Sequence, residues 1–220
     1  MLYGGMLGSA MATKYPVIAI RDVPLYRQQY EASGIRVALG YHVTSQNYLD
    51  SIQNVGFKPS HNGYDWLGDG SYFWEEDLDR AADWAEQRFH SERAVIGVLV
   101  RLNNCMDLPR NRKKWLGALQ ATYAEVRNLH RRNKIRLPHQ SRGAHRLDCL
   151  VFNRTIENLA NQGINIQSVR EIFTEGRPAW WRSGIHAQSH IQIAIRDDSV
   201  IEAIWILETP EEFEEADRIL

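Results

Sequence analysis

Residues 35–45 read IRVALGYHVTS, a β-rich and largely apolar run that ends in a histidine and two hydroxyl residues. Such a run predicts an interior strand that carries His42 near its exit. The following residues, 45–56 (SQNYLDSIQNVG), begin on Ser45 as an N-cap and stop at Gly56, which predicts a helix. The chain is therefore expected to leave an interior strand through a helix, with His42 close to the junction.

Strands and short helices are mixed irregularly on both sides of this segment. Further strands are expected at 16–21, 71–74, 93–102, 148–152, 190–197 and 200–207, the last two joined by an Asp-Asp-Ser turn. Helices are expected at 23–33, 77–89, 116–132 and 154–160. Because this order has no regular βαβ rhythm, it indicates an α+β fold and not a doubly wound sheet.

Bulk properties define the class of protein. The chain has 220 residues, is 44% hydrophobic and carries a formal net charge of -1, so we expect one substantial core. Its two cysteines, Cys105 and Cys149, are too few for a disulfide framework and indicate a reducing compartment. The sequence has no run of about 18 apolar residues, which excludes a membrane-spanning helix. A cytoplasmic location is therefore expected.

The chain is expected to form one domain with two unlike ends. Residues 1–15 are assigned to a flexible N-terminus. Their opening, MLYGGMLGSAMA, has no charged region before its hydrophobic residues, so it is interpreted as a frayed start or an upstream start codon and not as a signal peptide. Residues 16–207 are assigned to a single domain with a basic insertion at about 105–146, and residues 208–220 to an acidic C-terminal tail. The sequence has neither a dinucleotide-binding glycine motif nor a phosphate loop. It also has no metal-ligand spacing, so no metal is expected.

A second polar–aromatic segment follows the first. Residues 67–76 read LGDGSYFWEE, in which two glycines permit a close turn before three consecutive aromatic residues. Strand alternation places Tyr72 and Phe73 on opposite faces, and Phe73 is expected in the core, while Trp74 can belong to either face. Taken singly, these residues also fit an edge strand with one side in the core.

Three pieces of the sequence together resemble a known family. Tyr41-His42-Val43-Thr44-Ser45, Gly68-Asp69-Gly70-Ser71-Tyr72-Phe73 and Ala82-Asp83-Trp84 occur in the order found in the ADP-ribosyltransferase superfamily. The resemblance is to the histidine–tyrosine–glutamate branch, which diphtheria toxin and the poly-ADP-ribose polymerases share, and it spans about residues 35–206. It implies a split β-sandwich with flanking short helices and an enzyme that uses NAD as co-substrate.

The resemblance also implies roles for individual residues. His42 would bond the adenine-side ribose hydroxyls, and the backbone after it would pair with the nicotinamide carboxamide. Tyr72 and Trp84 would sandwich the nicotinamide ring. The implied catalytic residues are His42, Tyr72 and Gln192, and the implied NAD-binding residues are His42, Val43, Thr44, Gly70, Tyr72 and Trp84. Taken singly, His42 also fits a histidine at a strand end whose hydrogen bonds are made within the protein. Trp84 also fits a core residue, and Gln192 fits an outward-facing polar residue.

Two positions depart from the family pattern. Val43 replaces the usual glycine, and Gln192 stands where the family has its catalytic glutamate. A glutamine amide can bond a ribose hydroxyl, but it supplies no negative charge against an oxocarbenium-like ribose. The exchange fits a slower enzyme, a lost activity or a different acceptor chemistry. Glu75, Glu76 and Asp148 are candidate substitutes for the missing carboxylate.

The acceptor is suggested by a strongly basic stretch. Between 110 and 146 there are eleven basic residues and one acidic residue, Glu125. The basic residues are Arg110, Arg112, Lys113, Lys114, Arg127, Arg131, Arg132, Lys134, Arg136, Arg142 and Arg146. We interpret the stretch as a track for a phosphate backbone, with Arg131, Arg132 and Lys134 as substrate contacts. A surface that docks an acidic partner protein, or the chain's own acidic end, is the alternative.

A loop before the last strands offers further substrate contacts. In residues 176–189, Trp180, Trp181 and Arg182 provide flat faces and a fork of donors suited to a splayed base, although the triplet also fits a loop anchor. His190 occupies the position where the family often recognises its acceptor. RNA is favoured, and the chain resembles the mRNA-modifying toxins of chaperone-linked toxin–antitoxin phage-defence systems, which implies an antitoxin partner. A transferase acting on protein and an inactive nucleotide- or nucleic-acid-binding module are the alternatives.

Overall fold

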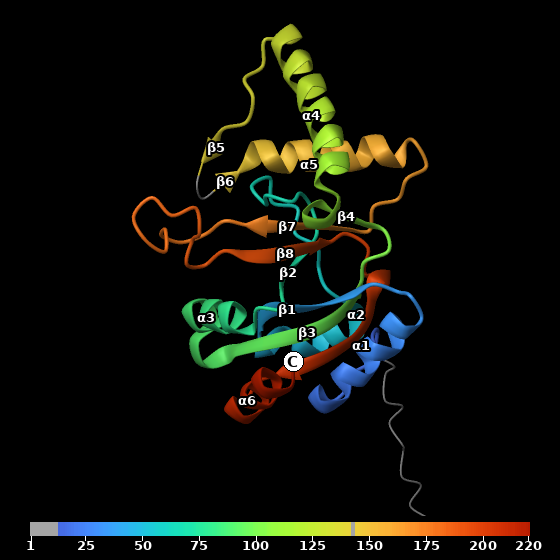
Figure 1. The fold of residues 1–220 in the computed structure, drawn as a ribbon, viewed down its shortest axis with the longest axis vertical. Helices are drawn as coiled ribbons and strands as arrows, with labels where there is room; N and C mark the ends of the chain where they lie inside the picture. Colours follow the sequence, from blue (N-terminus) through green and yellow to red (C-terminus); the bar gives the residue numbers. More distant parts are fainter. Residues whose placement is uncertain (1–12, 142–143) are drawn as a thin grey trace, which may run out of the picture.

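A seven-stranded mixed sheet organises the described part of the chain (Figure 1). The computed structural model describes residues 13–141 and 144–220. The sheet has the strand order β4-β7-β8-β2-β1-β3-β9. Its strands are β1 (Val37–Ser45), β2 (Ser71–Glu75), β3 (Arg93–Arg101), β4 (Cys105–Asp107), β7 (Ser168–Phe173), β8 (His190–Ile195) and β9 (Ile201–Leu207). A separate two-residue pair joins β5 (Gln140–Ser141) and β6 (Ala144–His145).

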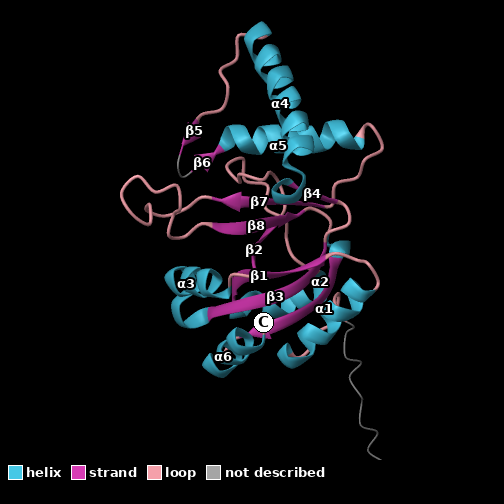
Figure 2. Cartoon of the chain, viewed as in Figure 1, coloured by secondary structure: helices cyan, strands magenta, loops and turns pink. Residues whose placement is uncertain are grey.

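Helices surround this sheet at both ends (Figure 2). They are α1 (Val23–Ala32), α2 (Leu49–Val55), α3 (Leu78–Phe89), α4 (Leu108–Arg132), α5 (Arg146–Ala160) and α6 (Pro210–Ile219). Short 3-10 turns occupy Ile20–Asp22, Gln46–Tyr48, His90–Glu92 and Asp198–Val200. The mixture of a large sheet with helices confirms the predicted α+β class.

The sheet is split between β1 and β2. Strand β1 pairs with β3 along its whole length, from Val37↔Arg101 to Ser45↔Arg93. With β2 it pairs only at Gly40↔Glu75 and Tyr41↔Trp74, after which the two strands separate. Strand β2 stays paired with β8 instead. The β1–β2 opening therefore begins at His42, the residue that follows the last pair.

Three apolar clusters hold the two halves. Phe73 is fully buried in the first, together with Ile96 and Ile193, and this confirms its predicted place in the core. The second lies on the other face of β1 and β3, where the Trp205 ring covers Gly97 and α3 and α6 pack. The third joins α4 and α5 to β4, β7 and β8. Each face of the sheet is thus covered by helices that bury their apolar side.

Several predicted elements are confirmed. The strands expected at 35–45, 71–74 and 93–102 correspond to β1, β2 and β3, and the helix expected at 77–89 corresponds to α3. The Asp77 side chain accepts a hydrogen bond from the Arg80 backbone N–H and so caps α3. The Ser45 side chain accepts from the Asn47 backbone N–H at the start of the helical segment that follows β1. Local capping chemistry and apolar patterning were sufficient for these elements.

Other predicted elements are wrong. Residues 148–152 are not a strand but belong to α5, where Cys149, Phe152 and Ile156 share one buried face at helical spacing. Residues 16–21 contribute only an isolated bridge, Val17↔Ile204. Strands β8 and β9 do not pair, because β9 lies at the far edge beside β3. Strand β7 was not predicted.

The expected domain boundaries also need correction. Residues 1–12 lie outside the described residues, but Tyr15 is buried and its hydroxyl donates to Asp198 (2.7 Å), so it belongs to the folded domain. The acidic C-terminal segment is a helix, α6, with a capping box between Thr209 and Glu212 and a buried Ala216. Residues 105–107 are not inserted, since they form β4 in parallel with β7.

No helix in the described part of the chain combines the length and the apolar character needed to cross a membrane.

Candidate active site

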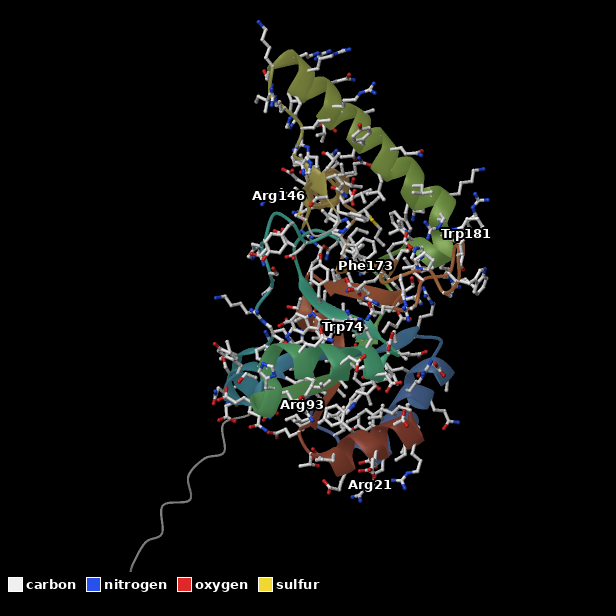
Figure 3. All side chains as sticks on the ribbon, turned by 90° about the vertical axis from the view of Figure 1, so that its left-hand side faces the viewer. Arg21, Trp74, Arg93, Arg146, Phe173 and Trp181 are labelled. Carbon is white, nitrogen blue, oxygen red and sulfur yellow. The ribbon has the colours of Figure 1, made fainter. Side chains whose placement is uncertain are left out.

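A cavity of about 770 Å³ lies beside the β1–β2 opening. Elements far apart in the sequence contribute to its wall: β1, β2, α3, β8 and the segments before β2 and after β7. Six residues of the predicted NAD site line it, namely His42, Val43, Gly70, Tyr72, Trp84 and Gln192. In Figure 3, Trp74 and Phe173, two further wall residues, lie at the middle of the molecule, below α4 and above the lower half of the sheet.

His42 occupies the point where the β1–β2 ladder ends. Its Nδ1 is 2.9 Å from the Tyr72 carbonyl oxygen, a backbone group that has no partner in β1. Because a carbonyl can only accept, Nδ1 carries the proton in the neutral ring. Burial lowers the pKa of His42, and the rings of Phe57 and Phe73 pack at 5.1 and 5.4 Å between centroids. The imidazole is therefore held neutral, with the Nε2 lone pair available as an acceptor.

The Tyr72 hydroxyl is used by the protein itself. It donates to the Gly68 carbonyl oxygen (2.7 Å) and accepts from the Leu67 backbone N–H (3.0 Å). Burial, with a contribution from the negative charge of Asp65, raises the pKa of this hydroxyl. The phenol thus stays protonated and anchored to the glycine turn, and its ring is what remains for contact in the cavity.

The glycine turn is fixed from behind by two long side chains. The Asp69 backbone N–H donates to Asn153 Oδ1 (2.9 Å), and Arg196 Nη1 donates to the Asp69 carbonyl oxygen (2.7 Å). Gly68 has φ 83°, and a Cβ there would overlap the Asn153 side chain. These contacts set the position of the turn and, through it, the position of the Tyr72 ring.

Gln192 is held in one orientation by a chain of hydrogen bonds. Trp66 Nε1 donates to Gln192 Oε1 (2.6 Å), and Gln192 Nε2 donates to His190 Nε2 (2.9 Å). His190 Nδ1 in turn donates to the Gln188 carbonyl oxygen (2.8 Å). Every donor in this series of hydrogen bonds has an acceptor only if His190 carries its proton on Nδ1. The amide is therefore a fixed component of the cavity wall.

His190 does not lie where an acceptor contact was predicted. Its side chain is only 1% exposed, and it is absent from the cavity wall. It supports Gln192 instead, with its ring 6.2 Å from that of Trp74 and 5.5 Å from that of Phe173. Thr44, a predicted NAD-binding residue, is likewise buried behind the wall. Strand alternation alone did not reveal how deeply the first residue of β8 is covered.

The aromatic residues divide differently from the prediction. Trp74, which the sequence left undecided, lines the cavity on the same strand face as Tyr72. Trp84 packs against Trp74, with 5.6 Å between ring centroids. Trp66 and Phe173 pack together at 4.9 Å and also line the cavity. The wall therefore contains two aromatic pairs in addition to the Tyr72 ring.

None of the three candidate carboxylates lies in the cavity wall. Glu75 forms an ion pair with Arg170 (2.5 Å), Glu76 forms one with Arg27 (2.9 Å), and Asp148 contacts Gln140 and His145. The wall contains Asp65 and Glu175 instead.

Glu175 accepts from Arg80 Nη2 with both oxygens, each at 3.0 Å. Neither Glu175 nor Arg80 was predicted from the sequence as a site residue. Arg80 precedes Trp84 by one helical turn, so it shares the face of α3 that lines the cavity.

The predicted acceptor contacts lie outside the cavity wall. Trp180 and Trp181 are 63% and 79% exposed on the loop between β7 and β8, and the Arg182 guanidinium lies 4.1 Å from the Trp181 ring. Arg131, Arg132 and Lys134 are exposed at the end of α4 that is remote from the sheet (Figure 1). The structure does not bring these two groups into contact with the cavity.

The basic stretch is partly neutralised. Arg112 forms an ion pair with Glu171 (2.6 Å), and Lys114 lies over the Trp115 ring. Its single acid, Glu125, is paired with Arg154 (3.1 Å), which leaves the basic end of α4 without an acidic neighbour from its own stretch. Arg142 lies outside the described residues.

Comparisons with models of protein families, with curated proteins and with solved structures give no match. Among residues 13–141 and 144–220, no group of three or more histidine, cysteine, aspartate or glutamate side chains is placed to hold a metal ion.

Proposed function

We propose that the cavity binds NAD and that the protein transfers ADP-ribose from it with release of nicotinamide. One observation carries the proposal. His42, Tyr72 and Gln192, which the family resemblance names as the catalytic set, come from three different strands and line the same cavity. Its volume of about 770 Å³ lies within the range of about 300–1,000 Å³ typical of small-molecule sites.

Each side chain offers a group that the reaction can use. The free Nε2 lone pair of His42 accepts a hydrogen bond from a ribose hydroxyl. The rings of Tyr72, Trp74 and Trp84 offer flat faces for a planar cationic nicotinamide. The Gln192 amide accepts a hydrogen bond from Trp66, and Gln192 is the strand partner of Trp74, so the amide can bond the nicotinamide-side ribose from this wall.

In the proposed reaction the bond between ribose C1′ and the nicotinamide nitrogen breaks, and its electron pair leaves with neutral nicotinamide. An acceptor nucleophile then forms the new bond to C1′ and gives up its proton. Catalysis is mainly positioning and electrostatic stabilisation of the oxocarbenium-like ribose. Because Gln192 has no charge, this stabilisation is weaker than a glutamate would supply, and we expect slow turnover.

The acceptor we favour is nucleic acid, with RNA ahead of DNA. The supporting observation is the exposed basic end of α4, which includes Arg127, Arg131, Arg132, Lys134 and Arg136. Such a cluster suits a phosphate backbone, and the exposed Trp180 and Trp181 suit unstacked bases. On this reading the protein acts as a toxin in phage defence and is restrained by an antitoxin protein.

The test is to incubate the purified full-length chain with NAD labelled in its adenylate, together with RNA, DNA or cell-lysate protein in separate reactions. Label in RNA supports the proposal. Label only in protein would replace the acceptor and leave the transferase. If no acceptor is labelled and no nicotinamide is released, the chain is a nucleotide-binding or nucleic-acid-binding module in which Gln192 marks a lost activity.

A further inference from the structure

The cavity wall contains three buried hydrogen-bond donors that have no partner among the described residues. They are Arg80 Nε, Arg80 Nη1 and Trp74 Nε1. Both residues line the cavity. Buried polar groups in folded proteins are nearly always paired, because an unpaired donor carries the full cost of its desolvation. Three unpaired donors on two residues of one cavity wall point to a ligand group that is rich in acceptors.

Among the described residues, the Arg80 side chain is hydrogen-bonded only to Glu175, through one of its three nitrogens. A guanidinium normally pairs with a carboxylate through two nitrogens in a fork. Here Nη2 alone donates to both oxygens of Glu175, and Nε and Nη1 have no hydrogen-bond partner among the described residues. The Arg80 side chain is only 11% exposed, so water access is restricted. Glu175 therefore compensates the charge of Arg80 and leaves most of its donors unused.

The charges around Arg80 favour an anionic ligand group. Lys58, Arg80 and Arg88 contribute three positive charges to the wall, and Asp65 and Glu175 contribute the two negative ones. Arg80, Trp84 and Arg88 recur at four-residue spacing on α3, so they share one helical face. Beside them the Trp74–Trp84 pair provides a surface for a flat ring. Cations next to aromatic rings match a nucleotide, whose phosphates and base are covalently joined.

We propose that Arg80, together with Trp74 Nε1 on the same cavity wall, binds the diphosphate of the dinucleotide, and that Glu175 is an internal competitor which the diphosphate displaces. The inference rests on the proposed function, since it names the anchor for the middle of the NAD molecule. In the unliganded protein Glu175 occupies Nη2. Once Glu175 is displaced and the guanidinium turns toward the cavity, a diphosphate can engage Nη2 together with Nε or Nη1, which no carboxylate among the described residues contacts. After displacement the Glu175 carboxylate stays in the cavity. It then supplies a negative charge there, which the neutral Gln192 does not.

The proposal predicts opposite effects for the two members of the pair. Arg80→Gln removes charge-assisted hydrogen bonds, so ADP-ribose should bind about 10- to 100-fold more weakly. Glu175→Gln keeps the shape and one acceptor but removes the competing charge, so ADP-ribose should bind about three- to tenfold more tightly. A purely structural role of the ion pair would make both variants weaker binders.

The experiment is calorimetric titration of the full-length chain with ADP-ribose and, as a phosphate-free probe, adenosine. Adenosine affinity should be the same in the wild type and in both variants. Arg93→Gln is the matched control, because Arg93 pairs with Glu86 outside the cavity, and it should bind both probes normally. Thermal melts establish that each variant is folded. If Arg80→Gln does not fold, Glu175→Gln still tests the inference, because the inference predicts tighter binding of ADP-ribose and a purely structural ion pair predicts weaker binding.

Unchanged ADP-ribose affinity in a folded Arg80→Gln variant would overturn the inference, as would weaker binding to Glu175→Gln. An equal loss for adenosine and ADP-ribose would also overturn it, because the loss would then not depend on phosphate. A separate titration with inorganic pyrophosphate distinguishes failure of the proposed function from failure of the anion site. Arg80-dependent binding of pyrophosphate without binding of NAD or ADP-ribose would refute the NAD proposal and retain the anion site.

Discussion

Tyr72 allows its ring and its hydroxyl to be tested separately. The hydroxyl donates to the Gly68 carbonyl oxygen and accepts from the Leu67 N–H, both buried residues. Tyr72→Phe leaves these two backbone groups unpaired, at a cost of about 1–2 kcal/mol each, or about 2–4 kcal/mol in total. That loss is within the stability of an ordinary domain, about 5–15 kcal/mol, so the variant should fold with a lower melting temperature.

The functional consequence should follow the ring and not the hydroxyl. We expect Tyr72→Phe to release nicotinamide from NAD at nearly the wild-type rate, and Tyr72→Ala to release none. The assay is chromatographic measurement of nicotinamide, with thermal melts run on the same samples. If Tyr72→Ala does not fold, Tyr72→Leu keeps the bulk and removes the aromatic face.

Normal nicotinamide release by a folded Tyr72→Ala or Tyr72→Leu variant would show that the site is wrong. A folded but inactive Tyr72→Phe variant would show that the hydroxyl takes part in the reaction, against the structural role that its two hydrogen bonds assign to it.

Three further predictions concern Gln192, His42 and the basic residues at the end of α4. In Gln192→Glu a carboxylate would face the oxocarbenium-like ribose; two opposite unit charges about 4 Å apart attract by about 4 kcal/mol at an effective dielectric constant of about 20, so nicotinamide release should rise. An unchanged or lower rate would contradict the proposed role. Burial lowers the pKa of His42, so the unfolded chain binds more protons than the folded one as the pH falls below about 6.5, and the free energy of unfolding decreases. Urea titrations should therefore show the wild type losing more stability than His42→Gln between about pH 7 and 5, and parallel losses would refute this. Reversing the charges of Arg131, Arg132 and Lys134 should weaken RNA modification and flatten its salt dependence, whereas an unchanged salt response would remove the backbone-track interpretation.

The predictable parts of the fold were those decided by local chemistry. The apolar run at 37–45, the Asp77 cap and the alternation of Tyr72 with Phe73 each depend on residues close in sequence. The error at 148–152 has a similar local cause. Residues 149–152 include an apolar run that fits a strand, and only its continuation to Ile156 shows the helical spacing of α5.

The unpredictable parts of the site depend on pairings between distant segments. Glu175 reaches the cavity because β7 lies next to β8, and nothing near it in the sequence indicates that it meets Arg80. His190 and Gln192 share a strand face, but the contacts that bury His190 come from Trp74 and Phe173 on other strands. His42, Tyr72 and Gln192, which the family resemblance names, line one cavity, while their hydrogen-bond partners come from segments distant in the sequence.

The most direct test of the account is the release of nicotinamide from NAD by the purified wild-type chain, measured with and without RNA. The account predicts slow release by the wild type, stimulated by RNA, and none by Tyr72→Ala. A folded wild-type chain that neither binds NAD nor releases nicotinamide under any of these conditions would contradict it.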